Sequence, residues 1–282
     1  MKLPSSLTTN ADSDCDPTVV EGRFGGRDAA GFRELAADLG RVNVRALLAA
    51  NPHSIAGALQ ATATIPIVML GGVDPVRSGW VKSLSRPEGN LTGLAVETHT
   101  LLGKHLELLR EIEPRTSRVA VLYSPESAVA AVNADFLRED LAARLGMSVQ
   151  PVPVRTREEL LAALSAMAQD RPQGLVVFGG TPVLQTHRVA IAEFAARERL
   201  PTVTGLNVLV RDGLLMSYAH DPAEAFRRAG WYVHRILMGT SVAELPIELM
   251  SRFHLLLNLK TAKSLGLNIP PTLLARADEV IE

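Results

Sequence analysis

The chain of 282 residues is poor in several residue types, and each shortage removes a class of function. A single cysteine, Cys15, excludes a disulfide framework and a cysteine-based zinc site. Aromatic residues make up only 4%, too few for platforms that stack single-stranded nucleic acid. Lys and Arg number 29 against 30 Asp and Glu, so we expect no basic surface for nucleic acid or anionic membranes.

Long apolar runs are also missing. No window of about 18 apolar residues occurs, so the sequence predicts no membrane-spanning helix. Residues 1–17 lack the apolar core of an export signal, and no apolar stretch precedes Cys15 as it would a lipid-attached cysteine. We expect residues 1–17 to be a disordered lead-in and Cys15 to be a solvated loop residue.

The familiar catalytic motifs are absent too. The sequence contains no GxxxxGK[ST] loop, no GxGxxG at a helix start, no GxSxG elbow and no HExxH. None of the seven histidines stands at a recognised metal-ligand spacing from another histidine or an acidic residue. The sequence therefore predicts no catalytic residue, no metal ion and no cofactor, and a lone histidine here is better read as a surface or core residue.

What the sequence does contain is an alternation of short apolar runs and amphipathic stretches. Continuous apolar runs are typical of strands buried on both faces, and leucines at helical spacing predict helices. The strand candidates are 65–70, 118–123, 175–178 and 214–218, with weaker ones at 44–48, 148–154 and 201–204. The helix candidates are 29–39, 101–112, 132–145, a capped helix from Thr156, 189–199 and 223–238. This alternation predicts an α/β fold with doubly wound parallel sheets.

Two stretches rich in turn-forming residues, 85–93 and 205–213, divide the chain. They predict two lobes. We expect residues 18–93 with about 219–246 to form lobe 1, and residues 94–218 with about 247–282 to form lobe 2.

Ligands of parallel α/β sheets lie beyond the carboxyl ends of the strands. The segments that follow the strongest strand candidates are 71–75, 123–127, 179–182 and 217–221, which are rich in Gly, Ser, Thr, Asp and Pro. Each one alone favours an ordinary capped turn. Four such segments on one kind of edge, with Tyr123 and Tyr218 among only three tyrosines, favour a cleft for a small molecule.

The same stretches resemble a family of ABC-transporter substrate-binding proteins that includes tryptophan- and tyrosine-type uptake receptors. The resemblance covers the chain from about residue 18 to the C-terminus. It is carried by the order of the segments 61–93, 105–127 and 213–248, and above all by the C-terminal string FHLLLNLKTAKSLGLNIPPTLLARADEVIE.

The resemblance implies a periplasmic-binding-protein type I-like fold of two hinged lobes. It also implies a small amino-acid-like or carboxylate ligand, delivery to an ABC permease with its ATPase, no catalysis, and a place in the periplasm or cell envelope. The family's ligand loops fall on Gly72, Val73, Asp74, Tyr123, Ser124, Glu126, Ser127, Gly180, Thr181 and Tyr218.

Charge suggests how these loops share the ligand. We expect Glu126 or Asp74 to hold an ammonium group, and the free amides at the helix starts near Ser127 and Thr181 to hold a carboxylate.

The sequence departs from the family at its beginning. Residues 18–22 look like the family's second strand, so we expect the first strand and helix of lobe 1 to be missing. We expect either a start further upstream or a truncated lobe 1 with impaired binding.

Two alternatives remain beside the receptor. An enzyme of similar two-lobed α/β form, acting on a small metabolite, would need an acid–base or nucleophile cluster in the cleft. A cytosolic small-molecule sensor fits a chain without an export signal, and would need an output module.

Overall fold

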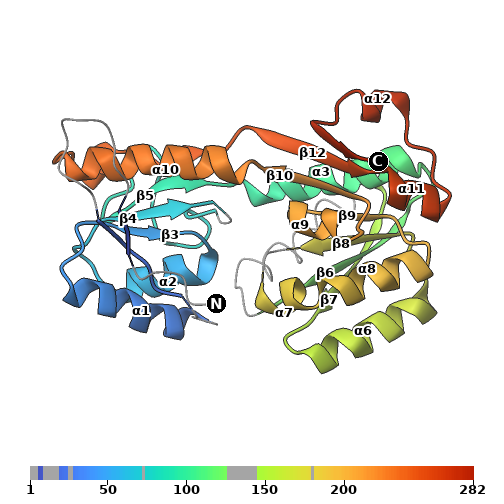
Figure 1. The fold of residues 1–282 in the computed structure, drawn as a ribbon, viewed down its shortest axis with the longest axis horizontal. Coiled ribbons are helices and arrows are strands. Elements are labelled where there is room, and N and C mark those ends of the chain that lie inside the picture. Colours follow the sequence, from blue (N-terminus) through green and yellow to red (C-terminus); the bar gives the residue numbers. More distant parts are fainter. Residues whose placement is uncertain (1–5, 9–18, 25–27, 72–73, 126–144, 179–180) are drawn as a thin grey trace.

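The computed structural model of the protein describes residues 6–8, 19–24, 28–71, 74–125, 145–178 and 181–282. They form two lobes, each with a β-sheet between layers of helices (Figure 1). The small lobe is built on a four-stranded sheet and the large lobe on a seven-stranded sheet. The α/β prediction with two parallel-dominated sheets is confirmed.

The small lobe has the strand order β11-β5-β4-β3, and every neighbouring pair is parallel. Its strands are β3 (Leu47–Ala49), β4 (Ile67–Leu70), β5 (Leu91–Ala95) and β11 (Glu248–Leu249). Its helices are α1 (Ala29–Arg41), α2 (Pro52–Ala61), α10 (Pro222–Leu237) and the 3-10 turn η2 (Val242–Glu244).

Strand β4 shows why the central strands read as unbroken apolar runs. Ile67 and Met69 pack in the cluster that contains α1 and α2, whereas Val68 and Leu70 pack against α10. All four side chains are buried. Successive side chains on a strand point to opposite faces, so a strand covered on both faces needs apolar residues at every position.

Gly93 allows β5 to lie against β4. A Cβ atom at this position would lie 2.3 Å from the Met69 carbonyl oxygen, and its φ of +118° favours glycine. The stretch 85–93, predicted as a divider between lobes, therefore ends inside a buried strand of the small lobe. The prediction missed β5 because its Gly93 is a poor strand former and the strand follows directly on the turn-forming residues that end at Asn90.

The large lobe has the strand order β13-β12-β10-β9-β8-β6-β7. Its strands are β6 (Arg118–Tyr123), β7 (Ser148–Pro153), β8 (Gly174–Phe178), β9 (Thr202–Thr204), β10 (Met216–His220), β12 (Phe253–Asn258) and β13 (Glu279–Ile281). Its helices are α3 (Thr98–Ile112), α6 (Arg157–Asp170), α7 (Pro182–Thr186), α8 (Arg188–Arg197), α9 (Asn207–Arg211), α11 (Leu259–Leu265) and α12 (Pro271–Leu274).

Strand β6 divides its side chains between the two faces of the large sheet. Val119, Val121 and Tyr123 belong to the cluster on the α3 side, and Ala120 and Leu122 belong to the cluster on the α6–α8 side. All sheet pairs in this lobe are parallel except β10 with β12. That antiparallel pair, which places residues 216–220 beside residues 253–257, was not predicted.

Three segments connect the lobes. The chain leaves the small sheet after β5, returns to the small lobe at Asp221 after β10, and leaves again through residues 250–252 between β11 and β12. The stretch 205–213, predicted as one of the two dividers of the chain, instead contains α9 within the large lobe.

Most predicted elements are present with small shifts of their ends, and the helix from Thr156 begins with that residue as its N-cap. The helix predicted over 132–145 falls outside the described residues, apart from its last residue. Two short strands, β1 (Ser6–Thr8) and β2 (Val19–Glu21), pair antiparallel. Strand β1 lies within the lead-in that was expected to be disordered, and β2 pairs with it rather than with the small sheet.

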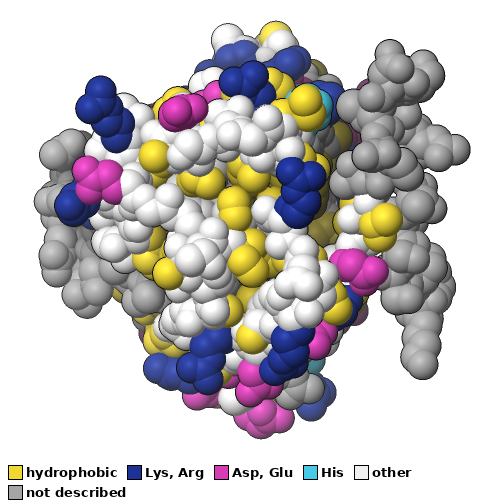
Figure 2. Space-filling view, turned by 90° about the vertical axis from the view of Figure 1, so that its left-hand side faces the viewer, with side chains coloured by type: hydrophobic (Ala, Val, Ile, Leu, Met, Phe, Trp, Pro, Cys, Tyr) yellow, Lys and Arg dark blue, Asp and Glu magenta, His cyan; other side chains and the backbone are white. Residues whose placement is uncertain are grey.

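The outer end of the small lobe faces the viewer in Figure 2. Among the described residues on this face, hydrophobic side chains are scattered, and Lys and Arg lie mostly toward the margins. Both signs of charge are present. This fits the near-neutral composition of the chain.

Candidate functional site

The strand ends of the large lobe bring two predicted ligand residues to one edge. Strands β6 and β8 are parallel neighbours, with Tyr123 opposite Phe178 at their carboxyl ends. Ser124 follows β6 directly, and Thr181 is the N-cap residue of α7 after β8. In Figure 1 these strand ends lie on the side of the large lobe that faces the small lobe.

Both side chains are buried and have unused hydrogen-bonding capacity. Ser124 is 0% exposed and Thr181 is 6% exposed. Neither Ser124 Oγ nor Thr181 Oγ1 has a hydrogen-bond partner among the described residues. A buried hydroxyl without a partner costs about 1–3 kcal/mol, and such a group can still hydrogen-bond to a molecule that arrives from outside.

A third such atom lies on α3, at a residue that the sequence did not single out. His105 is fully buried, its Nε2 lies 2.9 Å from the Tyr218 carbonyl oxygen, and its Nδ1 has no partner among the described residues. Burial lowers the pKa of His105 from 6.5 to about 4, so the ring is neutral at pH 7. The sequence gave no reason to single out His105 within its amphipathic helix, because the burial of its ring in the lobe is a tertiary property.

The two predicted tyrosines differ in their surroundings. Tyr123 is buried in the core cluster on the α3 side, so most of its ring serves packing. Tyr218 is half-buried in the middle of β10, and its ring stacks on Phe253 with centroids 5.4 Å apart. The pair Tyr218–Phe253 therefore offers an aromatic surface close to the crossover into the small lobe.

Asp74 has a local structural role. Its Oδ1 accepts hydrogen bonds from the backbone amides of Val76 and Arg77 at 3.0 and 3.1 Å. This is the capped turn that each loop was expected to form if it had no ligand. The second carboxylate oxygen is not used by these bonds, so capping and ligand binding are compatible.

Five of the ten predicted ligand residues fall outside the described residues. They are Gly72, Val73, Glu126, Ser127 and Gly180. Their assignment, like the predicted division of an ammonium and a carboxylate among the loops, stays a prediction.

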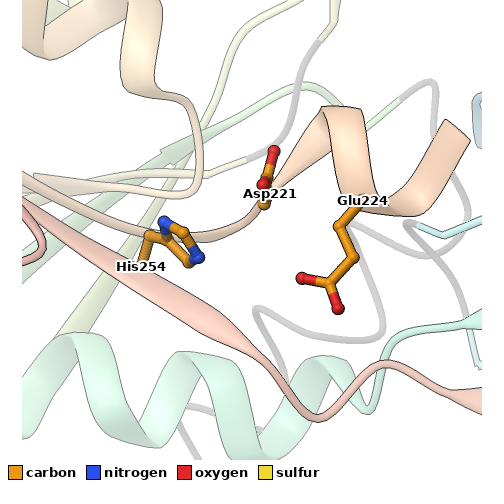
Figure 3. A group of neighbouring side chains, drawn as sticks. All are labelled: Asp221, Glu224 and His254. Carbon is orange, nitrogen blue, oxygen red and sulfur yellow. The ribbon is translucent and has the colours of Figure 1, made fainter. Parts of the chain in front are cut away.

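A groove of about 500 Å³ lies away from these strand ends, between α10, β11 and residues 250–252. Its lining includes Asp221, Glu224, Trp231, Leu249 and Arg252. Beside it, Asp221, Glu224 and His254 place one potential ligand atom each within 4.8 Å of one another (Figure 3). The sequence predicted no metal site, because His254 is remote from the two carboxylates along the chain.

The fold and these strand ends define a class of protein. Two α/β lobes are joined by three crossover segments, and buried hydroxyls with no partner in the described part of the chain lie at the strand ends that face the other lobe. This is the arrangement of a two-lobed binding protein that holds a small ligand between its lobes.

The comparisons with known proteins identify the family. The family model described as ABC transporter substrate binding protein matches residues 38–281, so this chain belongs to that family. It is a family of substrate-binding proteins and not of enzymes.

A curated relative is also a binding protein. The chain is 27% identical over 222 residues to a tyrosine-binding protein of Clostridioides difficile (strain R20291), covering 78% of this chain and 63% of that protein. The chain thus spans a little under two thirds of that relative's length.

Two solved structures share the fold. One is an ABC domain in complex with L-Trp from Streptococcus pneumoniae, with a TM-score of 0.82, 21% identity, and coverage of 90% of this chain and 84% of that one. The other is a conserved domain protein from Vibrio cholerae O1 biovar eltor, with a TM-score of 0.81, 25% identity and the same coverage. Within the described residues, no helix has both the length and the apolar character needed to span a membrane.

Proposed function

We propose that this protein binds a free amino acid between its two lobes and passes it unchanged to the permease and ATPase of an ABC import system. Membership of the substrate-binding family supports the transport role. The tyrosine-binding relative and the L-Trp complex support an aromatic amino acid as ligand. We place the protein at the cell envelope, where such receptors meet their permeases.

The observation that carries this proposal is the pair of buried hydroxyls of Ser124 and Thr181, neither of which has a hydrogen-bond partner in the part of the chain that the structure describes. Two hydroxyl donors at adjacent strand ends suit the carboxylate of an amino acid, since hydrogen bonds to a charged acceptor are the stronger kind. Thr181 lies at the start of α7. This helix has five residues and is too short for its N-terminal amides to bind a carboxylate without the hydroxyl.

The aromatic pair Tyr218–Phe253 supports the choice of side chain. An aromatic ligand gains about 0.5–1.5 kcal/mol per ring pair beyond simple burial. Tyr218 is half-buried, which leaves part of its ring for a ligand.

Catalysis is not part of the proposal. Hydrolytic use of Ser124 would need a general base in hydrogen-bond contact, and Ser124 Oγ has no such partner among the described residues. His105 uses Nε2 for the Tyr218 carbonyl and stays neutral at pH 7. Binding of a ligand without chemical change therefore fits Ser124 and His105 better than catalysis does.

Isothermal titration calorimetry with matched ligands tests the proposal. We expect L-tyrosine or L-tryptophan to bind once per chain. Tyramine, which lacks the carboxylate, and 3-(4-hydroxyphenyl)propionate, which lacks the ammonium group, should each bind at least tenfold more weakly, about 1.4 kcal/mol. Failure of both aromatic amino acids to bind, or equal affinity for tyramine and L-tyrosine, would refute this ligand class.

A further inference from the structure

Three metal-ligating side chains gather where the chain crosses between the lobes. Asp221 is the N-cap residue of α10, Glu224 lies in the first turn of that helix, and His254 lies on β12. One ligand atom of each lies within 4.8 Å of the other two. Figure 3 shows the imidazole on one side and the two carboxylates on the other.

These residues belong to both lobes. Glu224 is on α10, which covers the small sheet, whereas His254 is in the seven-stranded sheet of the large lobe. Asp221 is in the crossover between them, directly after β10, and β10 pairs with β12 so that Ala219 lies opposite His254. An ion held by all three would link the two lobes at the hinge.

The histidine brings an observation that is independent of the carboxylates. His254 Nε2 is buried and has no hydrogen-bond partner among the described residues. Such a nitrogen is left with an unused lone pair or proton, which is costly in a folded protein. Coordination of a metal ion is one ordinary way in which a histidine is satisfied.

The carboxylates are available as well. Asp221 uses Oδ1 to accept the Ala223 amide at 2.8 Å, as the N-cap residue of α10. Glu224 has an ion pair with Arg252 Nη1 at 3.8 Å. This contact is long, and 72% of the Arg252 side chain is exposed, so the arginine is a displaceable counter-ion.

An ion can reach the cluster from solvent. Asp221 and Glu224 both line the groove of about 500 Å³ beside α10. Arg227, Arg228 and Arg252 line it too, and Arg228 is already paired with Glu248. Arg252 is therefore the cation that competes most directly for Glu224.

We propose that Asp221, Glu224 and His254 form a site for a divalent transition-metal ion of the Zn²⁺ type, which ties the start of α10 to β12. One imidazole with two carboxylates suits Zn²⁺, whereas Ca²⁺ and Mg²⁺ prefer oxygen ligands alone. Ligands around tetrahedral Zn²⁺ lie about 3.4 Å apart, given bonds of about 2.0–2.2 Å. The observed spacing thus needs only side-chain adjustment, and a water molecule would complete the coordination.

Zinc titration of the chelator-treated protein, without any amino acid, tests the site. We expect one Zn²⁺ per chain by calorimetry. His254→Gln removes the imidazole, and Asp221→Asn removes the charge but keeps an N-cap side chain of equal quality. Each variant should weaken Zn²⁺ binding at least tenfold, whereas Arg252→Ala should strengthen it by removing the competing cation.

Controls separate this site from stray binding and from misfolding. His234→Gln, at an exposed position on the same helix, should leave Zn²⁺ affinity unchanged. Co²⁺ should give the visible absorption bands of a tetrahedral site in the wild type and not in His254→Gln, and urea unfolding should show that each variant folds. The proposal is overturned if the wild type binds no Zn²⁺ at 100 µM, a dissociation constant that corresponds to a binding free energy of about −5.5 kcal/mol. It is also overturned if His254→Gln and Asp221→Asn bind Zn²⁺ as tightly as the wild type does.

Discussion

His105 donates a hydrogen bond from Nε2 to the main-chain carbonyl oxygen of Tyr218, at 2.9 Å, from a helix to a strand 113 residues further along the chain. Because a carbonyl oxygen only accepts, the proton is on Nε2, and Nδ1, which has no partner among the residues described, has the lone pair. The helix that leads out of the first crossover is thus tied to the strand that leads into the second. Tyr218 is held near the predicted ligand edge by this contact.

The buried His105 predicts loss of stability in acid. In the unfolded chain it binds a proton below about pH 6.5, but in the folded protein only below about pH 4. The unfolded state therefore binds more protons between these values, and the free energy of unfolding falls as pH decreases from 6.5 to 4, by about 3 kcal/mol in all. Above pH 6.5 the contribution is fully present.

Urea unfolding of wild type and His105→Gln at pH 7.0 and pH 4.5 measures this effect. Glutamine can still donate to the Tyr218 carbonyl but does not titrate, so the variant should lose less stability on acidification than the wild type. The exposed His234→Gln should behave as the wild type. An identical acid response in His105→Gln would show that another group is responsible.

Ser124→Ala and Thr181→Val should separate stability from binding. Each removes a buried hydroxyl that has no partner among the described residues, so the free energy of unfolding without ligand should stay equal or rise by up to about 1 kcal/mol. Affinity for the amino acid should fall about tenfold or more in each. Calorimetry and urea unfolding of the same preparations check both, and a variant that loses stability while binding normally would contradict the assignment.

Asp74 can be tested for its two roles by two substitutions. Asp74→Asn keeps an oxygen that can accept the amides of Val76 and Arg77, whereas Asp74→Ala removes the cap and should cost about 1 kcal/mol of stability. If the carboxylate also holds the ligand ammonium, both variants should bind the amino acid at least tenfold more weakly. Normal affinity in Asp74→Asn would leave Asp74 as a turn residue only.

Gly93→Ala should be severely destabilising. The added Cβ would lie 2.3 Å from the Met69 carbonyl oxygen, and the backbone φ of +118° is unfavourable for alanine. Strand β5 would have to move away from β4, and we expect a loss of about 3 kcal/mol or more. Gly89→Ala, where a Cβ meets no atom within 4 Å although φ is also positive at +131°, is the control for backbone strain alone. Equal thermal unfolding temperatures for the two variants would contradict the steric argument.

Local pattern was enough to predict the fold class. Runs such as 118–123 are apolar at every position because both faces of the strand are covered, and this requirement is visible in the sequence itself. The same pattern located the carboxyl edge of the sheet, and with it Ser124 and Thr181, because the residues after a parallel strand must lie at that edge. Strand β5 was missed since its glycine is explained only by the neighbouring strand.

The tertiary structure alone decided which distant residues meet. The antiparallel addition of β12 beside β10, the contact of His105 with Tyr218, and the approach of His254 to Asp221 all join positions that no spacing rule connects. Periodicity records whether a side chain faces a core or solvent, because that depends on its own segment. It does not record which other segment lies opposite, because that depends on how the chain crosses between the lobes and in which direction each strand enters its sheet.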